Sequence, residues 1–173
     1  LKSKVSEFAK NNEYSNFEFL SSIPGTVGGG VSMNAGCFDS EMSDIVSQIS
    51  VIDLSGDEKI ITLDDIGFDY RKSELPDSYI IIEILFKKTK KIQSTIIEKK
   101  INLFKKKKNK NQPSGIRTGG STFKNPISSP KAAWELIKET GCDELSYGNA
   151  KFSSHHCNFI DNSKLALSAD IEK

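Results

Sequence analysis

A lysine-rich segment, residues 89–111, divides the chain and favours a fold built from two units. Apolar residues recur in it at helical spacing, which predicts a surface helix that runs into a basic connector. These residues are Ile92, Ile96, Ile97, Ile101 and Phe104. The lysine run KKKKNK is either a solvated helix end or a contact for a polyphosphate. We therefore expect one unit in residues 1–88 and another in residues 112–173.

Both helix and strand signals occur before this connector. Apolar and polar side chains alternate in residues 45–54, which are rich in β-branched residues and predict a strand. Residues 55–57 predict a turn, and residues 59–63 predict the returning strand. The nearly continuous apolar run at 78–88 predicts a strand that is buried on both faces. Residues 1–11 indicate an amphipathic helix. Its apolar side carries Val5, Phe8 and Ala9.

The part after the connector also mixes helix and strand. Ser129 is placed to cap a helix that starts at Pro130 and stops at Gly141, and residues 157–160 predict a short strand. The helix is expected to turn inward Ala133, Trp134 and Ile137. Because strands and helices do not alternate regularly, we predict an α+β fold.

Composition excludes several classes of protein. The net charge of +1 gives no field that points to nucleic acid or to a membrane surface. Cys37, Cys142 and Cys157 are odd in number and form no CxxC pair, which argues against a disulfide framework and a zinc site and fits a reducing cytosol. No stretch has the length of a signal peptide or a membrane span. Both ends interrupt expected helices, so we expect the chain to be a fragment of a longer protein.

The stretch IPGTVGGGVSMNAG is the first candidate for a binding site. Pro24-Gly25 predicts a turn, and three successive glycines at 28–30 remove side chains from the main chain. Exposed N–H groups there could form an anion nest, and a flat ring could approach closely. The spacing is neither GxGxxG nor GxxxxGK[ST], so a tight structural loop remains an equal alternative.

The stretch FDYRKS offers a charged group next to an aromatic ring. Arg71 follows Tyr70 near a predicted strand end, where its planar guanidinium could face a carboxylate. A surface arginine without a ligand is the alternative.

The stretch GIRTGGSTFKNP presents one hydroxyl, that of Ser121, after two glycines. The serine could be a nucleophile if a histidine lies near it, or it could deliver a proton to a carbon that becomes basic during a reaction. Lys124 and Asn125 could bind a phosphate or an amide of a ligand. A glycine loop capped by serine, without chemistry, is the alternative.

The stretch SSHHCNFIDN contains the two histidines of the chain, His155 and His156. No third ligand follows at a familiar spacing, so we expect no metal site. A polar strand edge that lines a cleft is the preferred interpretation.

Four strings together resemble one family, the UDP-N-acetylenolpyruvoylglucosamine reductases, also called UDP-N-acetylmuramate dehydrogenases. The strings are FLSSIPGTVGGGVSMNAG, FDYRKS, QPSGIRTGGSTFKNP and HHCNFIDN, which stand in the family's order and extend over nearly the whole chain. The variety without an inserted tyrosine loop is most similar, because little sequence separates FDYRKS from GSTFKNP.

The resemblance implies a flavoprotein oxidoreductase of the cytoplasm that takes part in peptidoglycan synthesis, and hence in cell wall biogenesis, cell shape and cell division. Its cofactor would be FAD, NADPH would donate hydride, and the UDP-sugar enolpyruvate would become UDP-N-acetylmuramate. It implies that residues 1–88 are the later part of an FAD-binding region like that of vanillyl-alcohol oxidase. Residues 112–173 would belong to a small substrate-binding domain. The oligomeric state does not follow from the resemblance.

The resemblance also assigns roles to residues. Ser121 would be the proton donor, and Arg71 would stabilise the enolate that hydride addition creates. Substrate contacts would come from Tyr70, Gly120, Lys124 and Asn125. The FAD would lie along Ile23, Pro24, Gly25, Thr26, Gly28, Gly29, Gly30, Asn34, Ala35 and Gly36.

Some family features lie outside this sequence. The family's first flavin phosphate loop would precede Leu1, its third catalytic group, a glutamate, would follow Lys173, and Cys157 replaces a usual alanine. An inactive fragment or decayed gene product that retains at most UDP-sugar binding is therefore the alternative function. A hydrolase that pairs Ser121 with a histidine is a third, although the G-x-S-x-G setting is absent.

Overall fold

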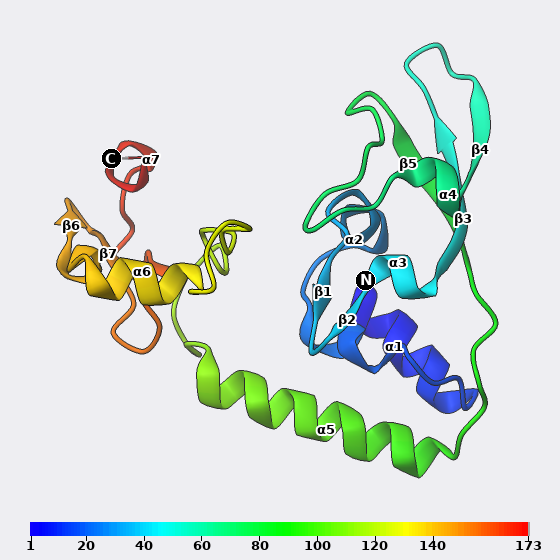
Figure 1. The fold of residues 1–173 in the computed structure, drawn as a ribbon, viewed down its shortest axis with the longest axis horizontal. Helices are drawn as coiled ribbons and strands as arrows, with labels where there is room; N and C mark the ends of the chain where they lie inside the picture. Colours follow the sequence, from blue (N-terminus) through cyan, green and yellow to red (C-terminus); the bar gives the residue numbers. More distant parts are fainter. Residues whose placement is uncertain (173) are drawn as a thin grey trace. The chain divides into compact units, whose positions relative to one another are not determined.

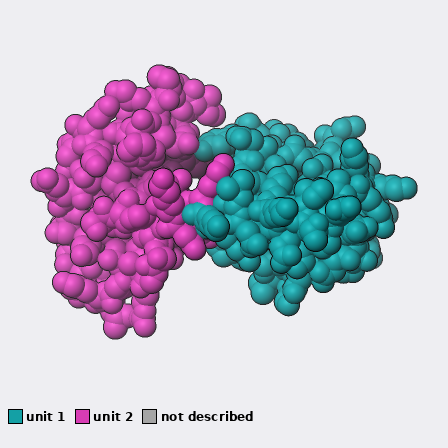
Figure 2. Space-filling model, turned by 90° about the horizontal axis from the view of Figure 1, so that it is seen from below, with its two compact units in different colours: residues 1–106 teal, residues 107–173 magenta. Residues whose placement is uncertain are grey.

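The computed structural model describes residues 1–172, which form two compact units. The units are Leu1–Lys106 and Lys107–Lys173 (Figure 2), and their boundary falls inside helix α5, Ser94–Asn111. Both units combine helices with small antiparallel sheets, in agreement with the predicted α+β class (Figure 1).

Unit 1 is built around the three-stranded sheet β4-β3-β5, which is antiparallel throughout. Its elements are α1 (Lys2–Asn11), the 3-10 turn η1 (Glu18–Ser22), α2 (Val27–Ser32), β1 (Gly36–Cys37), β2 (Ser40–Glu41), α3 (Met42–Ile45), β3 (Val46–Ile52), β4 (Glu58–Thr62), α4 (Leu63–Ile66), β5 (Ile80–Phe86) and most of α5. The central strand β3 supplies the fully buried Ile49 and Val51, and Phe19, Leu20 and Met42 pack into the same core. The predicted hairpin of β3 and β4 is confirmed.

Strand β5 exists as predicted, but its predicted burial on both faces is wrong. It pairs only with β3, and Ile80 is 62% exposed while Leu85 is 53% exposed. An edge strand of an antiparallel sheet needs only one covered face, so a continuous apolar run does not require two. Ile84 lies half-buried against the core and represents the covered face.

Helix α1 confirms part of the predicted apolar side: Ala9 is buried and Val5 packs against the core, but Phe8 turns outward. Its buried residues are Lys2, Ser6 and Ala9, and Phe8 is 65% exposed. Lys2 occupies the inner side because its Nζ donates to the carbonyl oxygen of Thr26 at 3.1 Å. A long side chain with a satisfied ammonium group can thus replace an apolar residue at a helix face.

Within the glycine stretch, for which a structural loop was one of two alternatives, residues Val27–Ser32 form helix α2. Thr26 caps it by accepting a hydrogen bond from the N–H of Gly29 at 3.1 Å on its Oγ1. Glycine disfavours helix by about 1 kcal/mol per residue relative to alanine, so packing must compensate. A Cβ at Gly30 would lie 3.1 Å from Cδ of Lys2, and one at Gly28 would touch Ile81 at 3.6 Å. The absent side chains let α2 lie close to its neighbours.

Helix α5 begins at Ser94, later than the predicted segment, and three of its predicted apolar residues are buried. They are Ile97, Ile101 and Phe104. The Phe104 ring stacks on Phe38 with 4.3 Å between centroids. Lys100 forms an ion pair at 3.4 Å with Glu18, whose side chain is 2% exposed. These contacts attach the first turns of α5 to unit 1.

Unit 2 contains the sheet β6-β7-β8 and helix α6. Its elements after α5 are α6 (Ala133–Glu139), the 3-10 turn η2 (Cys142–Glu144), β6 (Ser146–Tyr147), β7 (Ala150–Phe152), β8 (Ile160–Asp161) and α7 (Ser168–Ile171). The predicted helix is present and Gly141 has the left-handed φ of 70° after its end, but the helix starts at Ala133 and not at Pro130. Ser129 accepts from the N–H of Lys131 at 3.1 Å, in a turn that precedes the helix.

Candidate active site

The stretch FDYRKS forms a tight turn that carries Arg71. The N–H of Asp69 donates to the carbonyl of Lys72 at 3.0 Å, and the N–H of Lys72 donates back at 3.2 Å. Arg71 has a φ of 54°, a left-handed conformation that costs an ordinary residue about 1–2 kcal/mol. Its guanidinium carbon lies 5.1 Å from the centroid of the Tyr70 ring. Surrounding contacts must therefore hold this turn in place.

Asn34 supplies those contacts and joins this turn to the MNAG stretch. Its side chain is buried, its Nδ2 donates to the carbonyl of Asp69 at 3.1 Å, and its Oδ1 accepts from the N–H of Ser43 at 3.1 Å. Arg71 in turn donates from Nη2 to the carbonyl of Gly36 at 2.7 Å and from Nη1 to that of Asn34 at 3.4 Å. One edge of the guanidinium is thus oriented by main-chain oxygens.

The residues expected to contact a cofactor differ in exposure. Residues 24–26 and Gly29 are exposed, whereas Gly30 and Asn34 are buried. The buried pair serves the packing of Lys2 and of the Arg71 turn. Gly25 and Gly29 expose main chain without a Cβ, and this lets a flat or phosphorylated group approach closely. Residues 24–26 precede helix α2 and Gly29 lies in it, so this exposed main chain is at the start of a helix.

Ser121 stands at the wall of a cavity in unit 2. It forms an antiparallel bridge with Phe159, and Gly120 before it has a φ of 104° that favours glycine. The cavity has a volume of about 600 Å³. It is lined by Arg117, Thr118, Gly119, Gly120, Ser121, Thr122, Ile160, Asn162 and Ile171. The hydroxyl of Ser121 accepts a hydrogen bond from Nδ2 of Asn158 at 2.8 Å.

Asn158 is the residue that sequence reasoning missed. It is buried, and its Nδ2 also donates to the carbonyl of Phe123 at 2.9 Å while its Oδ1 accepts from the N–H of Phe123 at 2.9 Å. Its main-chain oxygen accepts from the N–H of Thr122 at 2.8 Å. The sequence offered one signal, an asparagine inside the apolar run CNFI. A buried polar side chain nearly always has hydrogen-bond partners, so an asparagine in such a run predicts hydrogen bonds to other residues. Those partners stand 35 and 37 residues away in sequence.

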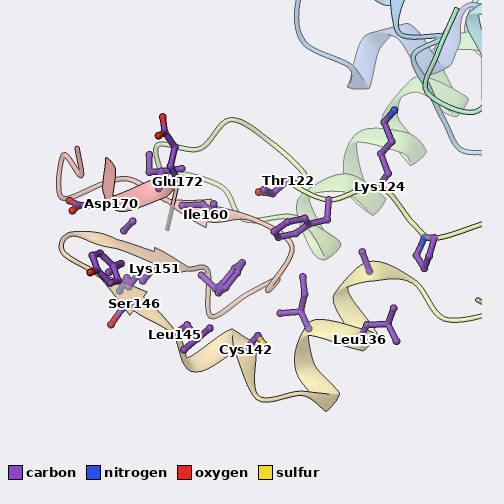
Figure 3. Close-up of a pocket in the computed structure, with 18 residues that line it drawn as sticks. Thr122, Lys124, Leu136, Cys142, Leu145, Ser146, Lys151, Ile160, Asp170 and Glu172 are labelled. Carbon is purple, nitrogen blue, oxygen red and sulfur yellow. The ribbon is translucent and has the colours of Figure 1, made fainter. Parts of the chain in front are cut away.

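Lys124 and Asn125 lie beyond the serine and have different surroundings. Lys124 lines a second, larger cavity of about 860 Å³. Figure 3 shows Leu136, Cys142 and Leu145 along one side of this cavity, with Thr122 and Ile160 along the other. Asn125 accepts from the N–H of Ala133 on its Oδ1 at 3.0 Å, at the start of α6. The carbonyl group of Asn125 is therefore used by the fold.

The two histidines make their hydrogen bonds away from Ser121. Nε2 of His155 lies 3.0 Å from the carbonyl oxygen of Lys110, and Nδ1 of His156 accepts from the N–H of Asn158 at 3.2 Å. Burial lowers the pKa of His156 below its ordinary value of 6.5. Among residues 1–172, no hydrogen bond joins the hydroxyl of Ser121 to a histidine ring, so a nucleophile at Ser121 would lack its base.

The described residues also lack two kinds of feature. Among residues 1–172, no three His, Cys, Asp or Glu side chains gather in a way that could hold a metal ion. Over the same residues, no helix is both long enough and apolar enough to cross a membrane.

Comparisons with known proteins agree with one another. The family model "UDP-N-acetylenolpyruvoylglucosamine reductase, C-terminal domain" matches residues 112–173. The UDP-N-acetylenolpyruvoylglucosamine reductase of Pelagibacter ubique is 44% identical over 100% of this chain, which covers 57% of that protein. The enzyme of the same name from Rickettsia conorii is 43% identical over 97% of this chain and 56% of its own length.

A solved structure gives the same answer for the fold. The crystal structure of UDP-N-acetylenolpyruvylglucosamine reductase (MurB) from Thermus caldophilus matches with a TM-score of 0.89 and 32% identity. The match covers 99% of this chain and 62% of that one, so the chain spans little more than half the length of the relatives it matches. On these similarities, the chain belongs to the UDP-N-acetylenolpyruvoylglucosamine reductase family.

Proposed function

We propose that the protein reduces UDP-N-acetylglucosamine enolpyruvate to UDP-N-acetylmuramate with FAD and NADPH, a step of peptidoglycan precursor synthesis in the cytoplasm. The observation that carries this proposal is the 44% identity to a reductase of that name along the whole chain. The presentation of Ser121 at a cavity wall supports it, because the resemblance assigns the proton transfer to this hydroxyl.

The two units divide the work. Residues 1–88 belong to an FAD-binding domain of the vanillyl-alcohol-oxidase type, residues 89–111 connect, and residues 112–173 belong to the substrate-binding domain. The match of the C-terminal domain model to residues 112–173 supports the last assignment. The two cavities of unit 2 offer room for parts of a UDP-sugar.

The exposed strip at residues 24–29 supports the assignment of a flavin site to unit 1. FAD, when bound, takes hydride from NADPH and supplies it to the substrate alkene. The chain's part is to hold the cofactor along main chain that lacks side chains. The residues assigned to it are Ile23, Pro24, Gly25, Thr26, Gly28, Gly29, Gly30, Asn34, Ala35 and Gly36.

Ser121 completes the reduction by giving up a proton. Hydride addition to one alkene carbon leaves the electron pair on its neighbour, which is conjugated with the substrate carboxylate. The O–H bond of Ser121 breaks, a C–H bond forms at that carbon, and solvent water returns a proton to the serine oxygen. A serine is a weak acid, so this transfer needs a strongly basic carbon that is held close and dry.

Arg71 stabilises the charge that develops on the substrate carboxylate. A fixed cation lowers the barrier most when it is oriented before the reaction, since no reorganisation is then needed. The hydrogen bond from its Nη2 to Gly36 supplies such an orientation. Further substrate contacts are assigned to Tyr70, Gly120, Lys124 and Asn125.

The two half-reactions test this function separately. In the protein expressed from its complete reading frame, Ser121→Ala should slow flavin reoxidation by the UDP-sugar by about two to four orders of magnitude. Flavin reduction by NADPH should keep its rate. Ser129→Ala is the matched control, because this serine lies in a turn of the same unit and accepts a hydrogen bond from the N–H of Lys131.

Stopped-flow absorbance at the flavin band measures both rates. Equal slowing of the two half-reactions by Ser121→Ala would make Ser121 a structural residue. A wild-type protein that binds UDP-sugar in calorimetry but takes up no flavin would contradict the reductase proposal and favour a binding module without redox chemistry.

A further inference from the structure

The amide of Asn158 is fixed in one orientation by its partners. Its Oδ1 accepts from the N–H of Phe123, so the Nδ2 group must face the other way. The two hydrogens of Nδ2 are then both used, one toward the carbonyl of Phe123 at 2.9 Å and one toward Oγ of Ser121 at 2.8 Å. If Oδ1 and Nδ2 of Asn158 were exchanged, the side-chain oxygen would face the carbonyl oxygen of Phe123, and two acceptors would oppose each other.

This orientation decides where the hydroxyl proton of Ser121 points. Since Oγ accepts from Asn158, the serine cannot donate its own proton along the same line. The proton is left for another acceptor, and Ser121 lines the 600 Å³ cavity with Arg117 and Asn162. The proton can then be directed into that cavity, toward a substrate carbon.

The same hydrogen bond also acts on the acidity of the serine. When Ser121 releases its proton, negative charge develops on Oγ, and a hydrogen bond to a charged acceptor is stronger than one to a neutral acceptor. Asn158 is 3% exposed, so water does not compete strongly for its amide. The donor therefore stabilises the serine oxygen more after proton release than before it.

We propose that Asn158 is a positioning residue for Ser121, whose Nδ2 aims the hydroxyl proton into the cavity and stabilises the oxygen as that proton leaves. The inference rests on the proposed function, in which Ser121 is the proton donor. It adds a residue from the HHCNFIDN stretch that composition and the family resemblance did not single out.

Asn158→Asp removes the donor with little change of shape, although it places a carboxyl oxygen against the carbonyl of Phe123. The carboxylate keeps an acceptor for the N–H of Phe123, and the main-chain bond from Thr122 and the bridge between Ser121 and Phe159 do not depend on this side chain. An ionised carboxylate would accept the hydroxyl proton of Ser121 and turn it away from the cavity. A protonated carboxyl group would restore a donor.

The kinetic experiment uses the protein expressed from its complete reading frame. Asn158→Asp should slow flavin reoxidation by the UDP-sugar about 100-fold at alkaline pH, the scale for one lost donor at a developing oxyanion. The rate should recover as the pH falls, and NADPH should reduce the flavin at the wild-type rate. Asn149→Asp, an exposed change in the same unit, is the matched control. The wild type measured over the same pH range corrects for His156, which faces the main chain of Asn158.

A double variant separates this inference from the proposed function. Ser121→Ala with Asn158→Asp should react no more slowly than Ser121→Ala alone, because the amide acts through the hydroxyl. Two results would overturn the inference and leave the reductase proposal standing. One is a double variant whose rate loss is the product of the two single losses. The other is a normal rate for Asn158→Asp when Ser121→Ala is impaired. Failure of the wild type to reoxidise with the UDP-sugar would refute the function itself.

A spectroscopic readout does not depend on activity or on the folding of the Asn158 variant. In the 173-residue chain, the two side-chain amide protons of Asn158 should give distinct, slowly exchanging NMR signals. Ser121→Ala should shift one of them and speed its exchange while the proton that faces Phe123 is unchanged. Two unaffected signals would refute the hydrogen bond on which the inference depends.

Discussion

Replacing Asn34 by glycine should cost unit 1 a large part of its stability. The N–H of Ser43, at the start of α3, would lose the acceptor it has in Oδ1, which costs about 1–3 kcal/mol for a buried donor left unpaired. The carbonyl of Asp69 would lose a bond worth about 1 kcal/mol, but it keeps the N–H of Lys72 as a donor. The expected loss is therefore about 2–4 kcal/mol.

Glycine is the informative replacement because Asn34 has a φ of 38°. Glycine accepts this conformation without strain, so the variant removes the side-chain bonds alone. Asn16→Gly is the matched control: Asn16 is an exposed asparagine with a φ of 72°, and it carries the same entropy cost in the unfolded chain. Urea unfolding followed by far-UV circular dichroism gives both free energies. A difference between the two variants below about 0.5 kcal/mol, the usual range for surface changes, would refute the role given to Asn34.

Two further predictions concern a glycine and a histidine. Gly36→Ala should destabilise the protein by about 1–3 kcal/mol, because the new Cβ would lie 2.6 Å from the carbonyl oxygen of Ser40. Gly119→Ala is the control, because a Cβ there would have no atom within 4 Å and should not destabilise the protein. Thermal melting measures both variants. Since burial holds the folded-state pKa of His156 below 6.5, the unfolded state binds the proton more readily, and stability should fall as the pH drops below 6.5. Urea unfolding followed by Trp134 fluorescence should show this loss, and His156→Gln should flatten the pH dependence; an unchanged slope would contradict the assignment to this ring.

The elements that were predicted correctly are determined mostly by residues that are close in sequence. The hairpin of β3 and β4 follows from alternation and from the turn at Gly56, and the end of α6 follows from Gly141. Both signals act within a few residues, where local sterics decide the conformation.

The errors arose where distant residues decide. Whether β5 is covered on one face or two depends on its place at the edge of the sheet, which the apolar run itself does not encode. The glycines of α2 favour a loop by propensity, but the Thr26 cap and the close approach of Lys2 and Ile81 outweigh that preference. For the same reason Ser121 and Arg71 could be named from local patterns, while Asn34 was named only as a contact of FAD and Asn158 was not named.

The residues that hold the Arg71 turn and the Ser121 loop are of the same kind. Arg71 and Gly120 both occupy left-handed backbone, in the turn and in the loop that present the two assigned catalytic side chains. In each case a buried asparagine, Asn34 in unit 1 or Asn158 in unit 2, bonds main-chain atoms from a segment far away in sequence. An asparagine suits this task because one side chain donates and accepts at once without bringing a charge into the interior. The position of each of these side chains then depends on a neutral amide that belongs to another segment of the chain.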